Sequence, residues 1–331
     1  MRLLVLTNNP DRASFRMRVA IHLGILRDNG IDCEVVKLPR GFWARQRLLQ
    51  QAAGFDGVFL HKKRLSWFDA ASLRRCARRI LYDFDDAVMY RDREPERISR
   101  ARFRAFGRIV RLADMVIAGN AYLGEHASRC HANVRVVPTG LDLNPYREER
   151  RRRDDGRVRL VWIGSATTLK YLAGIQPVLQ DLAGRFDNLT LRMISDEYLD
   201  MASMKMERCP WSGETEAAHL MTSDIGLAPL PDDPFTRGKC GFKILQYQAA
   251  GLPVVASPVG VNAQYVRDGV TGFLARDPAQ WADRLGELIV NPEMRTTLGR
   301  AGRREVEAFD VSVIGNRLCT LIAECLNQGR D

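Results

Sequence analysis

Short apolar runs of strand length alternate with longer amphipathic stretches along the chain, and this alternation limits the fold more than any other sequence feature. The runs of the first half lie at residues 2–7, 32–38, 57–61, 79–84, 114–119 and 134–138. Those of the second half lie at residues 158–164, 189–195, 224–230 and 253–257. Strands and helices that alternate in this way form a parallel sheet covered by helices on both faces. The sequence therefore predicts an α/β protein.

Two domains are expected, because 331 residues exceed the usual size of a single hydrophobic core. The alternation lapses after Pro138 in a stretch rich in Pro, Gly, Asp and Arg. We expect residues 141–157 to be a linker between a first domain that begins with residues 1–140 and a second domain at 158–310. Within the first domain, a helix over residues 13–29 is expected to end at Gly30.

The charge balance indicates an anionic partner. Fifty lysines and arginines oppose 40 aspartates and glutamates, for a formal net charge of +10. The sequence contains no helix-turn-helix, zinc-finger or RNA-binding signature, so we expect phosphorylated substrates or anionic lipid and no nucleic acid.

The seven cysteines include no CxxC pair, which argues against a disulfide framework and a zinc site. The sequence shows neither a signal peptide nor a run of about 20 apolar residues. We therefore expect a cytoplasmic protein without a bound metal.

A strand-to-helix segment of the second domain has the composition of a diphosphate site. The segment FTRGKCGFKILQYQAAG places glycines and two lysines ahead of an amphipathic helix that ends at Gly251, with Lys239 expected in the preceding loop. The candidate residues are Lys239, Gly241, Phe242 and Lys243. The N-terminus of a helix presents free N–H groups, glycine permits close approach of the backbone, and lysines add positive charge. The alternative is a solvated basic helix start.

A second candidate phosphate loop follows the strand at 158–164. Gly164, Ser165 and Thr167 supply backbone N–H groups and hydroxyls ahead of a helix that carries Lys170. An ordinary turn with a helix N-cap explains the same residues.

The run from Asp224 to Phe309, with segments DIGLAPL, KILQYQAAGLPVVASPVG and VRDGVTGFLARDP, resembles the carboxyl-terminal domain of family 4 glycosyltransferases. VWIGSATTLKYL resembles the opening strand and phosphate loop of that domain, and ADMVIAGNAYL and ILYDFDDAV resemble parts of the other domain. The resemblance implies the GT-B fold, in which two Rossmann-like domains face each other across a cleft. It also implies that a last helix, over about residues 311–328, returns to the first domain, which then comprises residues 1–140 plus 311–331.

The same resemblance implies a retaining, metal-independent transfer of a sugar from a nucleoside-diphosphate sugar to an acceptor hydroxyl. No cofactor is implied, and the acceptor class stays open between a glycan, a lipid-linked molecule and a small molecule. Lys239, Lys243 and Lys170 would stabilise the departing diphosphate, and a donor phosphate oxygen would take the acceptor proton.

The sequence departs from the family where many members have two glutamates. Gly238 and Gln246 occupy these positions. The second glutamate normally bonds the donor ribose, which the amide of Gln246 can also do. Trp211 and Tyr198 are candidates to flank the nucleobase. A non-catalytic partner subunit and a sugar-nucleotide epimerase remain alternatives.

In the first domain, Asp85 and Asp86 match positions where relatives have a His-Asp pair beside the transferred sugar, and a helix N-cap is the alternative. Arg16 and Arg18 are candidates to bind a phosphate or carboxylate. His61 and Asn120 also follow strands and are further candidates on the acceptor side.

Residues 97–113 form a basic amphipathic pattern with arginines at six positions. Such a helix either lies on the anionic inner face of the cell membrane or covers the sheet with its arginines in solvent.

Overall fold

The computed structural model describes residues 1–147 and 155–328, which divide into two compact units. The first unit consists of Met1–Asp142, Asp233–Cys240 and Phe309–Asp331, and the second of Leu143–Asp232 and Gly241–Ala308. The segment 233–240, which was expected in the second domain, thus belongs to the first unit. Residues 148–154 of the expected linker lie outside the described residues.

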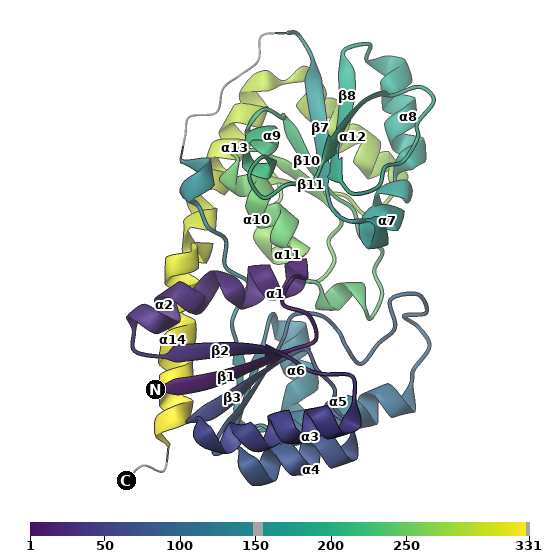
Figure 1. Cartoon of the computed structure of the whole chain (residues 1–331). Coiled ribbons are helices and arrows are strands. Elements are labelled where there is room, and N and C mark those ends of the chain that lie inside the picture. Colours follow the sequence, from purple (N-terminus) through teal and green to yellow (C-terminus); the bar gives the residue numbers. More distant parts are fainter. Residues whose placement is uncertain (148–154, 329–331) are drawn as a thin grey trace. The chain divides into compact units, whose positions relative to one another are not determined.

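The first unit, in its described part, contains a six-stranded parallel sheet with the order β2-β1-β3-β4-β5-β6 (Figure 1). The strands are β1 (Arg2–Thr7), β2 (Asp32–Lys37), β3 (Gly57–His61), β4 (Ile80–Phe84), β5 (Met115–Ala118) and β6 (Val134–Val136). The helices are α1 (Ala13–Arg18), α2 (Leu23–Asp28), α3 (Phe42–Gln51), α4 (Trp67–Cys76), α5 (Arg100–Leu112), α6 (Ala121–Ser128) and α14 (Val311–Asn327).

Helices cover both faces of this sheet. Leu49 of α3 and Leu73 of α4 belong to the core on one face. Leu26 of α2 and Ile322 of α14 belong to the core on the other face, and α14 packs beside α2 (Figure 1). The last helix therefore completes the first unit, whose sheet is buried on both sides as the apolar strands predict.

The second unit has the same design. Across its described residues, a six-stranded parallel sheet runs in the order β12-β11-β10-β7-β8-β9. The strands are β7 (Val158–Ile163), β8 (Leu189–Ser195), β9 (Lys205–Pro210), β10 (Ile225–Ala228), β11 (Val254–Ala256) and β12 (Gly272–Leu274). The helices are α7 (Leu169–Ala173), α8 (Gln176–Arg185), α9 (Glu216–Met221), α10 (Phe242–Ala249), α11 (Asn262–Tyr265), α12 (Pro278–Val290) and α13 (Pro292–Glu305).

Three elements differ from the sequence expectations. The helix expected over residues 13–29 is interrupted at Val19, where φ is −124°, and continues through a 3-10 turn into α2. Gly30 follows it with φ of +76°, as expected for a glycine that turns the chain. Strands β9 and β12 were not expected, because β9 is an exposed edge strand with three charged residues and β12 has only three residues.

Helix α5 forms within the basic amphipathic stretch, and its apolar face is buried. Phe106, Ile109 and Val110 belong to the core of the first unit. This helix therefore covers the sheet, as in the second interpretation of its sequence pattern, and its apolar face does not meet a membrane.

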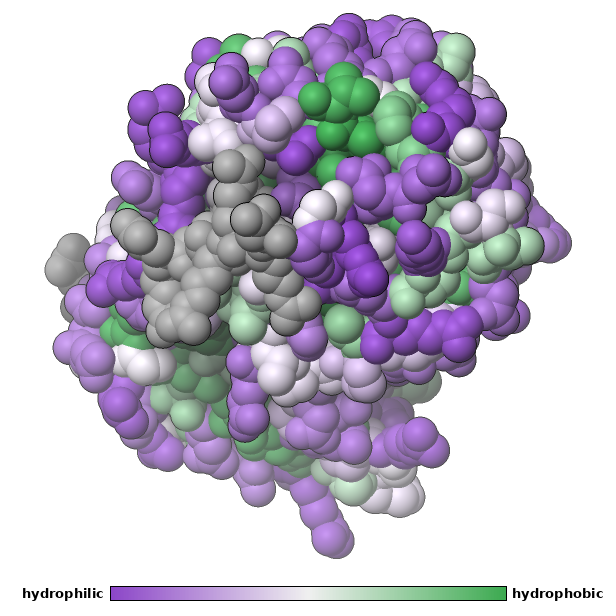
Figure 2. All heavy atoms as spheres, turned by 90° about the horizontal axis from the view of Figure 1, so that it is seen from above, coloured by the Kyte–Doolittle hydropathy of each residue, from purple (hydrophilic) through white to green (hydrophobic). Residues whose placement is uncertain are grey.

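No helix in residues 1–147 or 155–328 is long and apolar enough to cross a membrane. On the face shown in Figure 2, hydrophilic residues predominate and hydrophobic residues gather in small areas. Four large aromatic residues of the first unit are nevertheless exposed: Phe42, Trp43, Trp67 and Phe68.

The segment Asp233–Cys240 docks onto the first unit through specific hydrogen bonds. The amide of Asn120 donates to the Lys239 carbonyl at 3.1 Å, and the Tyr122 hydroxyl donates to the Pro234 carbonyl at 3.0 Å. The Cys240 thiol donates to the Asp85 carbonyl at 3.2 Å. These bonds fix the chain directly before α10.

Close backbone approach explains the glycine at position 238. A Cβ atom there would lie 2.7 Å from Ala87 Cβ and 2.9 Å from the Ala87 backbone nitrogen. The glutamate that many relatives have at this position therefore cannot be accommodated in this arrangement.

Replacing Gly238 with Ala is expected to destabilise the protein, because the added methyl group collides with Ala87. Overpacking of this kind costs about 1–3 kcal/mol. The measurement is the free energy of unfolding from denaturant titration. Gly213→Ala is the matched control, since a Cβ at Gly213 meets no atom within 4 Å. Equal stabilities of the two variants would contradict the docking described here.

Candidate functional site

Asp85 and Asp86 follow β4 and form an ion network with two lysines. Lys62 Nζ lies 3.0 Å from Asp85 Oδ1 and also contacts Asp86 Oδ2. Lys239 Nζ lies 3.5 Å from Asp86 Oδ1. The structure therefore brings together three residues that were expected to act on donor or acceptor, and adds Lys62.

The two lysines keep Asp86 ionised. Burial by itself would raise the pKa of Asp86, but the positive charges of Lys239 and Lys62 outweigh it and hold this pKa well below its usual range. Burial would likewise lower the pKa of Lys62, but Asp85 and Asp86 raise it. A carboxylate with so low a pKa is a weak base at neutral pH.

Lys62 was missed by the sequence analysis, although it directly follows β3 and precedes the equally basic Lys63 and Arg64. Its backbone adopts φ of +53°, a left-handed conformation that is unusual for a side chain other than glycine. Its position directly after a predicted strand could have marked Lys62 as a candidate site residue. Its ion pairs with Asp85 and Asp86 could not be predicted from the number of residues between them.

Arg18 is buried and binds inside the first unit. Its guanidinium lies 2.8 Å from Asp83 Oδ1 and donates to the Val137 carbonyl at 2.7 Å. His61 Nδ1 lies 2.9 Å from Asp83 Oδ2. Burial would raise the pKa of Asp83, but Arg18 and then His61 outweigh it and lower this pKa. Arg18 and His61 thus hold β4 in place and do not present their Asp83-bound atoms to a ligand.

Arg16 is exposed in the last turn of α1. Asn120 is buried and is the N-cap of α6, where its side-chain oxygen accepts from the Leu123 N–H at 2.9 Å. Its amide nitrogen holds the Lys239 carbonyl, so Asn120 positions the docked segment as well as the helix.

In the second unit, Lys243 and the loop at Gly164 both lie against the ring of Trp162. Lys243 Nζ is 4.8 Å from the ring centroid of Trp162. A Cβ at Gly164 would lie 2.4 Å from the same ring. Gly241 precedes Phe242 at the start of α10 with φ of +63°, and a Cβ there would lie 2.9 Å from Tyr265. The two phosphate-loop candidates therefore meet at Trp162.

The loop after β7 is capped internally. Ser165 and Thr168 form a reciprocal N-cap, and the hydroxyls of Ser165 and Thr167 lie 3.0 Å apart. Asp196 Oδ1 accepts from the Ala166 N–H at 2.8 Å. Lys170 is exposed in α7. An anion at this loop would share its N–H groups with Asp196.

Lys239 and Lys243 belong to different units, although they are four residues apart. Lys239 joins the carboxylates of the first unit, and Lys243 lies against Trp162 in the second. Lys239 precedes the helix, as expected, because α10 begins at Phe242.

Gln246 of α10 is buried, and its amide nitrogen donates to Glu216 Oε1 at 3.2 Å. The Trp211 indole N–H donates to Glu216 Oε2 at 2.7 Å. Tyr198 stands apart from this group, with the guanidinium of Arg208 5.8 Å from its ring centroid. Glu216 was missed, since a lone glutamate at a helix start carries no motif.

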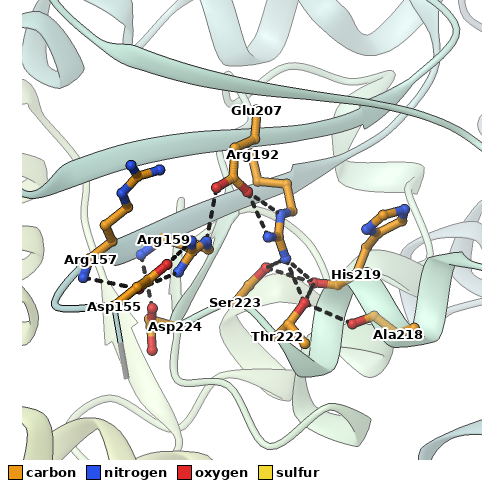
Figure 3. Close-up of polar contacts among 10 residues, drawn as sticks. All are labelled: Asp155, Arg157, Arg159, Arg192, Glu207, Ala218, His219, Thr222, Ser223 and Asp224. Carbon is orange, nitrogen blue, oxygen red and sulfur yellow. Dashed lines mark hydrogen bonds and ion pairs between the residues drawn. The ribbon is translucent and has the colours of Figure 1, made fainter. Parts of the chain in front are cut away.

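A buried arginine network supports this part of the second unit (Figure 3). Glu207 of β9 binds both Arg159 of β7 and Arg192 of β8, at 3.0 Å and 2.6 Å. Arg192 Nη1 also donates to the His219 carbonyl at 2.6 Å and the Thr222 hydroxyl at 2.8 Å. The network therefore joins three strands to the carboxyl end of α9.

The second unit thus presents a cation, a loop with one glycine and two hydroxyl side chains, and a helix N-terminus close together, which can bind a diphosphate. Within the described residues, no group of three histidine, cysteine, aspartate or glutamate side chains is placed to hold a metal ion.

Part of this chain is similar to a known protein family. Residues 157–291 match the family model of glycosyl transferases group 1. A D-inositol 3-phosphate glycosyltransferase from Geodermatophilus obscurus is 28% identical over 243 residues, which cover 63% of this chain and 52% of the relative. The chain spans about half the length of the curated relatives it matches.

Solved structures show the same fold over nearly the whole chain. HepE from Anabaena, in complex with UDP and glucose, has 16% sequence identity and a TM-score of 0.73, with 98% of this chain and 100% of that chain covered. Sucrose-phosphate synthase from Thermosynechococcus elongatus has 15% identity and a TM-score of 0.75, with 98% of both chains covered. The chain therefore has the GT-B fold, and residues 157–291 of its second unit are similar to the group 1 glycosyl transferases.

Proposed function

We propose that this protein is a retaining glycosyltransferase that moves a sugar from a nucleoside-diphosphate sugar to an acceptor hydroxyl, without a metal. The observation that carries the proposal is the meeting of Lys243, the start of α10 and the Gly164 loop at Trp162. The family match of residues 157–291 supports it, as does the presence of UDP in the similar HepE structure.

The main catalytic contribution in this proposal is electrostatic. Negative charge develops on the departing diphosphate, and Lys243 together with the N–H groups at the start of α10 stabilises it. Lys239 forms an ion pair with Asp86, so its positive charge stabilises that carboxylate in the first unit.

Asp86 is a poor candidate for the general base, because Lys62 and Lys239 hold its pKa low. A donor phosphate oxygen is therefore the proposed proton acceptor, and the carboxylates are proposed to bind sugar hydroxyls. The acceptor is a glycan, a lipid-linked molecule or a small molecule.

Removing the charge of Lys243 should weaken donor binding. A nucleoside diphosphate at 100 times its Kd stabilises the wild-type protein by about 2.7 kcal/mol. In a thermal-shift panel of UDP, GDP, ADP and CDP, Lys243→Met should weaken binding of the preferred ligand about tenfold or more. Lys205→Met is the control, because Lys205 is exposed on the edge strand β9.

An undiminished shift in Lys243→Met would show that the phosphate site lies elsewhere. No shift for any nucleotide, together with no cleavage of any sugar nucleotide, would favour a non-catalytic partner subunit. Release of an epimerised sugar nucleotide in the absence of an acceptor would favour an epimerase.

We further propose that the first unit contacts an anionic membrane surface through the starts of α3 and α4. Trp43 is 77% exposed, and Trp67 and Phe68 are each 64% exposed. Arg45 and Gln46 of α3 both bond the carboxylate of Asp69 in α4, which fixes these two helix starts side by side. The exposed aromatics Phe42, Trp43, Trp67 and Phe68, here called the aromatic patch, therefore lie at two neighbouring helix starts.

The charge around this aromatic patch fits anionic lipid. Residues 37–79 contain eleven lysines and arginines against two aspartates. Asp56 accepts from the Arg2 N–H, and Asp69 pairs with Arg45. Three of the cations also pair with carboxylates outside this stretch, namely Lys62 with Asp85 and Asp86, and Arg74 and Arg79 with Asp114. Burial and then repulsion from Arg45 and Arg64 lower the pKa of Lys63. Aromatic side chains beside such cations are typical of the membrane interface.

Trp43→Ala/Trp67→Ala should bind vesicles of phosphatidylcholine and phosphatidylglycerol about tenfold or more weakly than wild type in co-sedimentation, because two large apolar side chains are lost. Wild-type binding should also fall at high salt. Val313→Ala is the control, since Val313 is exposed on another helix of the first unit. Equal binding of the double variant and wild type would contradict the proposal.

A further inference from the structure

Helix α5 holds the two loops that follow β3 and β4. Arg102, in the first turn of this helix, donates from Nη2 to the Val88 carbonyl after β4 at 3.1 Å. Arg108 donates to the Leu65 carbonyl after β3 at 3.2 Å. Arg64 directly precedes Leu65, so Arg64 and Arg102 both lie at the carboxyl edge of the first sheet, where α/β proteins bind ligands.

These two arginines have no carboxylate partner in the part of the chain that the structure describes. Both residues are half-buried. Among the described residues, Arg102 Nε is buried without a hydrogen-bond partner, and the Arg64 guanidinium makes no hydrogen bond or ion pair. Burial, and then repulsion from Arg64 and Arg91, lower the pKa of Arg102. Arg64 and Arg102 are therefore close enough to repel each other, which costs free energy unless an anion accompanies them.

Neighbouring carboxylates are already paired with other cations. Asp69 of α4 lies 3.1 Å from Arg45, and Glu94 lies 2.8 Å from Arg91. Lys63 adds a further half-buried cation, and burial, then repulsion from Arg45, lower its pKa. The excess of positive charge at this edge of the sheet therefore suits an anion from outside the chain.

The chain joins these cations directly to two features of the proposed acceptor side. Lys62, before Lys63, pairs with Asp85 at 3.0 Å. Trp67, which follows Arg64 at the start of α4, belongs to the aromatic patch. Five residues of extended chain span at most about 18 Å. One elongated acceptor can therefore reach the carboxylates, the cations and the aromatic patch.

We propose that Arg64 and Arg102, together with Lys63, bind a phosphate group of the acceptor. Guanidinium groups form paired, charge-assisted hydrogen bonds with phosphate oxygens, and a phosphate between the two arginines replaces their repulsion with attraction. This inference rests on the proposed function, and it narrows the acceptor to a sugar or polyol that carries a phosphate. That phosphate either links the acceptor to a lipid or is free.

The first test uses inorganic pyrophosphate as the probe, with the proposed donor site saturated by the nucleoside diphosphate that best stabilises the protein. Titration calorimetry should detect pyrophosphate binding to wild type under these conditions. Arg64→Gln should weaken it about tenfold or more and leave the affinity for the nucleotide unchanged. Arg104→Gln, which removes an exposed charge of the same helix, should behave as wild type.

The stability of the ligand-free protein separates binding from a structural role. Arg64→Gln should melt at the same temperature as wild type or higher, because a repelling charge without a partner is removed. A structural arginine would instead lower the melting temperature when replaced. Arg64→Lys should recover part of the pyrophosphate affinity, since it restores the charge but not the paired hydrogen bonds.

Competition with bound pyrophosphate identifies the source of the phosphate. One competitor is a soluble hexose 1-phosphate, and the other is a phosphatidylcholine vesicle that contains a polyprenyl-linked sugar phosphate. Displacement by the first alone indicates a free acceptor, and displacement by the vesicles, but not by vesicles of phosphatidylcholine only, indicates a lipid-linked one. If neither displaces pyrophosphate, the acceptor role is overturned.

Equal pyrophosphate affinities of wild type and Arg64→Gln would overturn the inference and leave the proposed function intact, as would a wild type that binds no pyrophosphate. A protein that binds no nucleoside diphosphate would overturn the proposed function by itself. The pyrophosphate titration without nucleotide would then still decide whether Arg64 binds an anion.

Discussion

The parallel pairing of the strands is the constraint on which the rest of this structure depends. When all strands of a sheet run the same way, every loop that follows a strand reaches the same edge. Lys62 after β3, Asp85 after β4 and Asn120 after β5 therefore gather at one edge of the first sheet. The Gly164 loop after β7 and Trp211 after β9 gather in the same way in the second unit.

Much of the fold follows from the sequence, because buried parallel strands are nearly continuous apolar runs. The ten expected strands all form, within a few residues of their expected ends. Strand β9 was not predicted, because it is a partly exposed edge strand whose sequence, KMERCP, contains no continuous apolar run. The break at Val19 was also invisible, because Arg18 on one side of it finds Asp83 65 residues away. Only the tertiary structure supplies such a partner.

The sequence predicted several residues of the candidate site, but it did not predict which of them form ion pairs and hydrogen bonds with one another. From the sequence, Lys239 and Lys243 were expected at one diphosphate site. In the structure, Lys239 contacts Asp86, whereas Lys243 lies against Trp162. Spacing gave no reason to join Lys62 to Asp86 or Glu216 to Gln246, because these pairs come from different elements. Burial and hydrogen bonding set the role of a charged side chain, and neither can be read from its place in a motif.

The path of the chain has a consequence for the order in which the two units form during synthesis. The second unit is complete in sequence at Ala308, whereas the first still lacks α14. Ile314, Leu318 and Ile322 of α14 belong to one core with Leu3 and Val5 of β1. This face of the first sheet is thus covered only in part, by α1 and α2, until α14 has been made. The unit that begins the chain is the last to close.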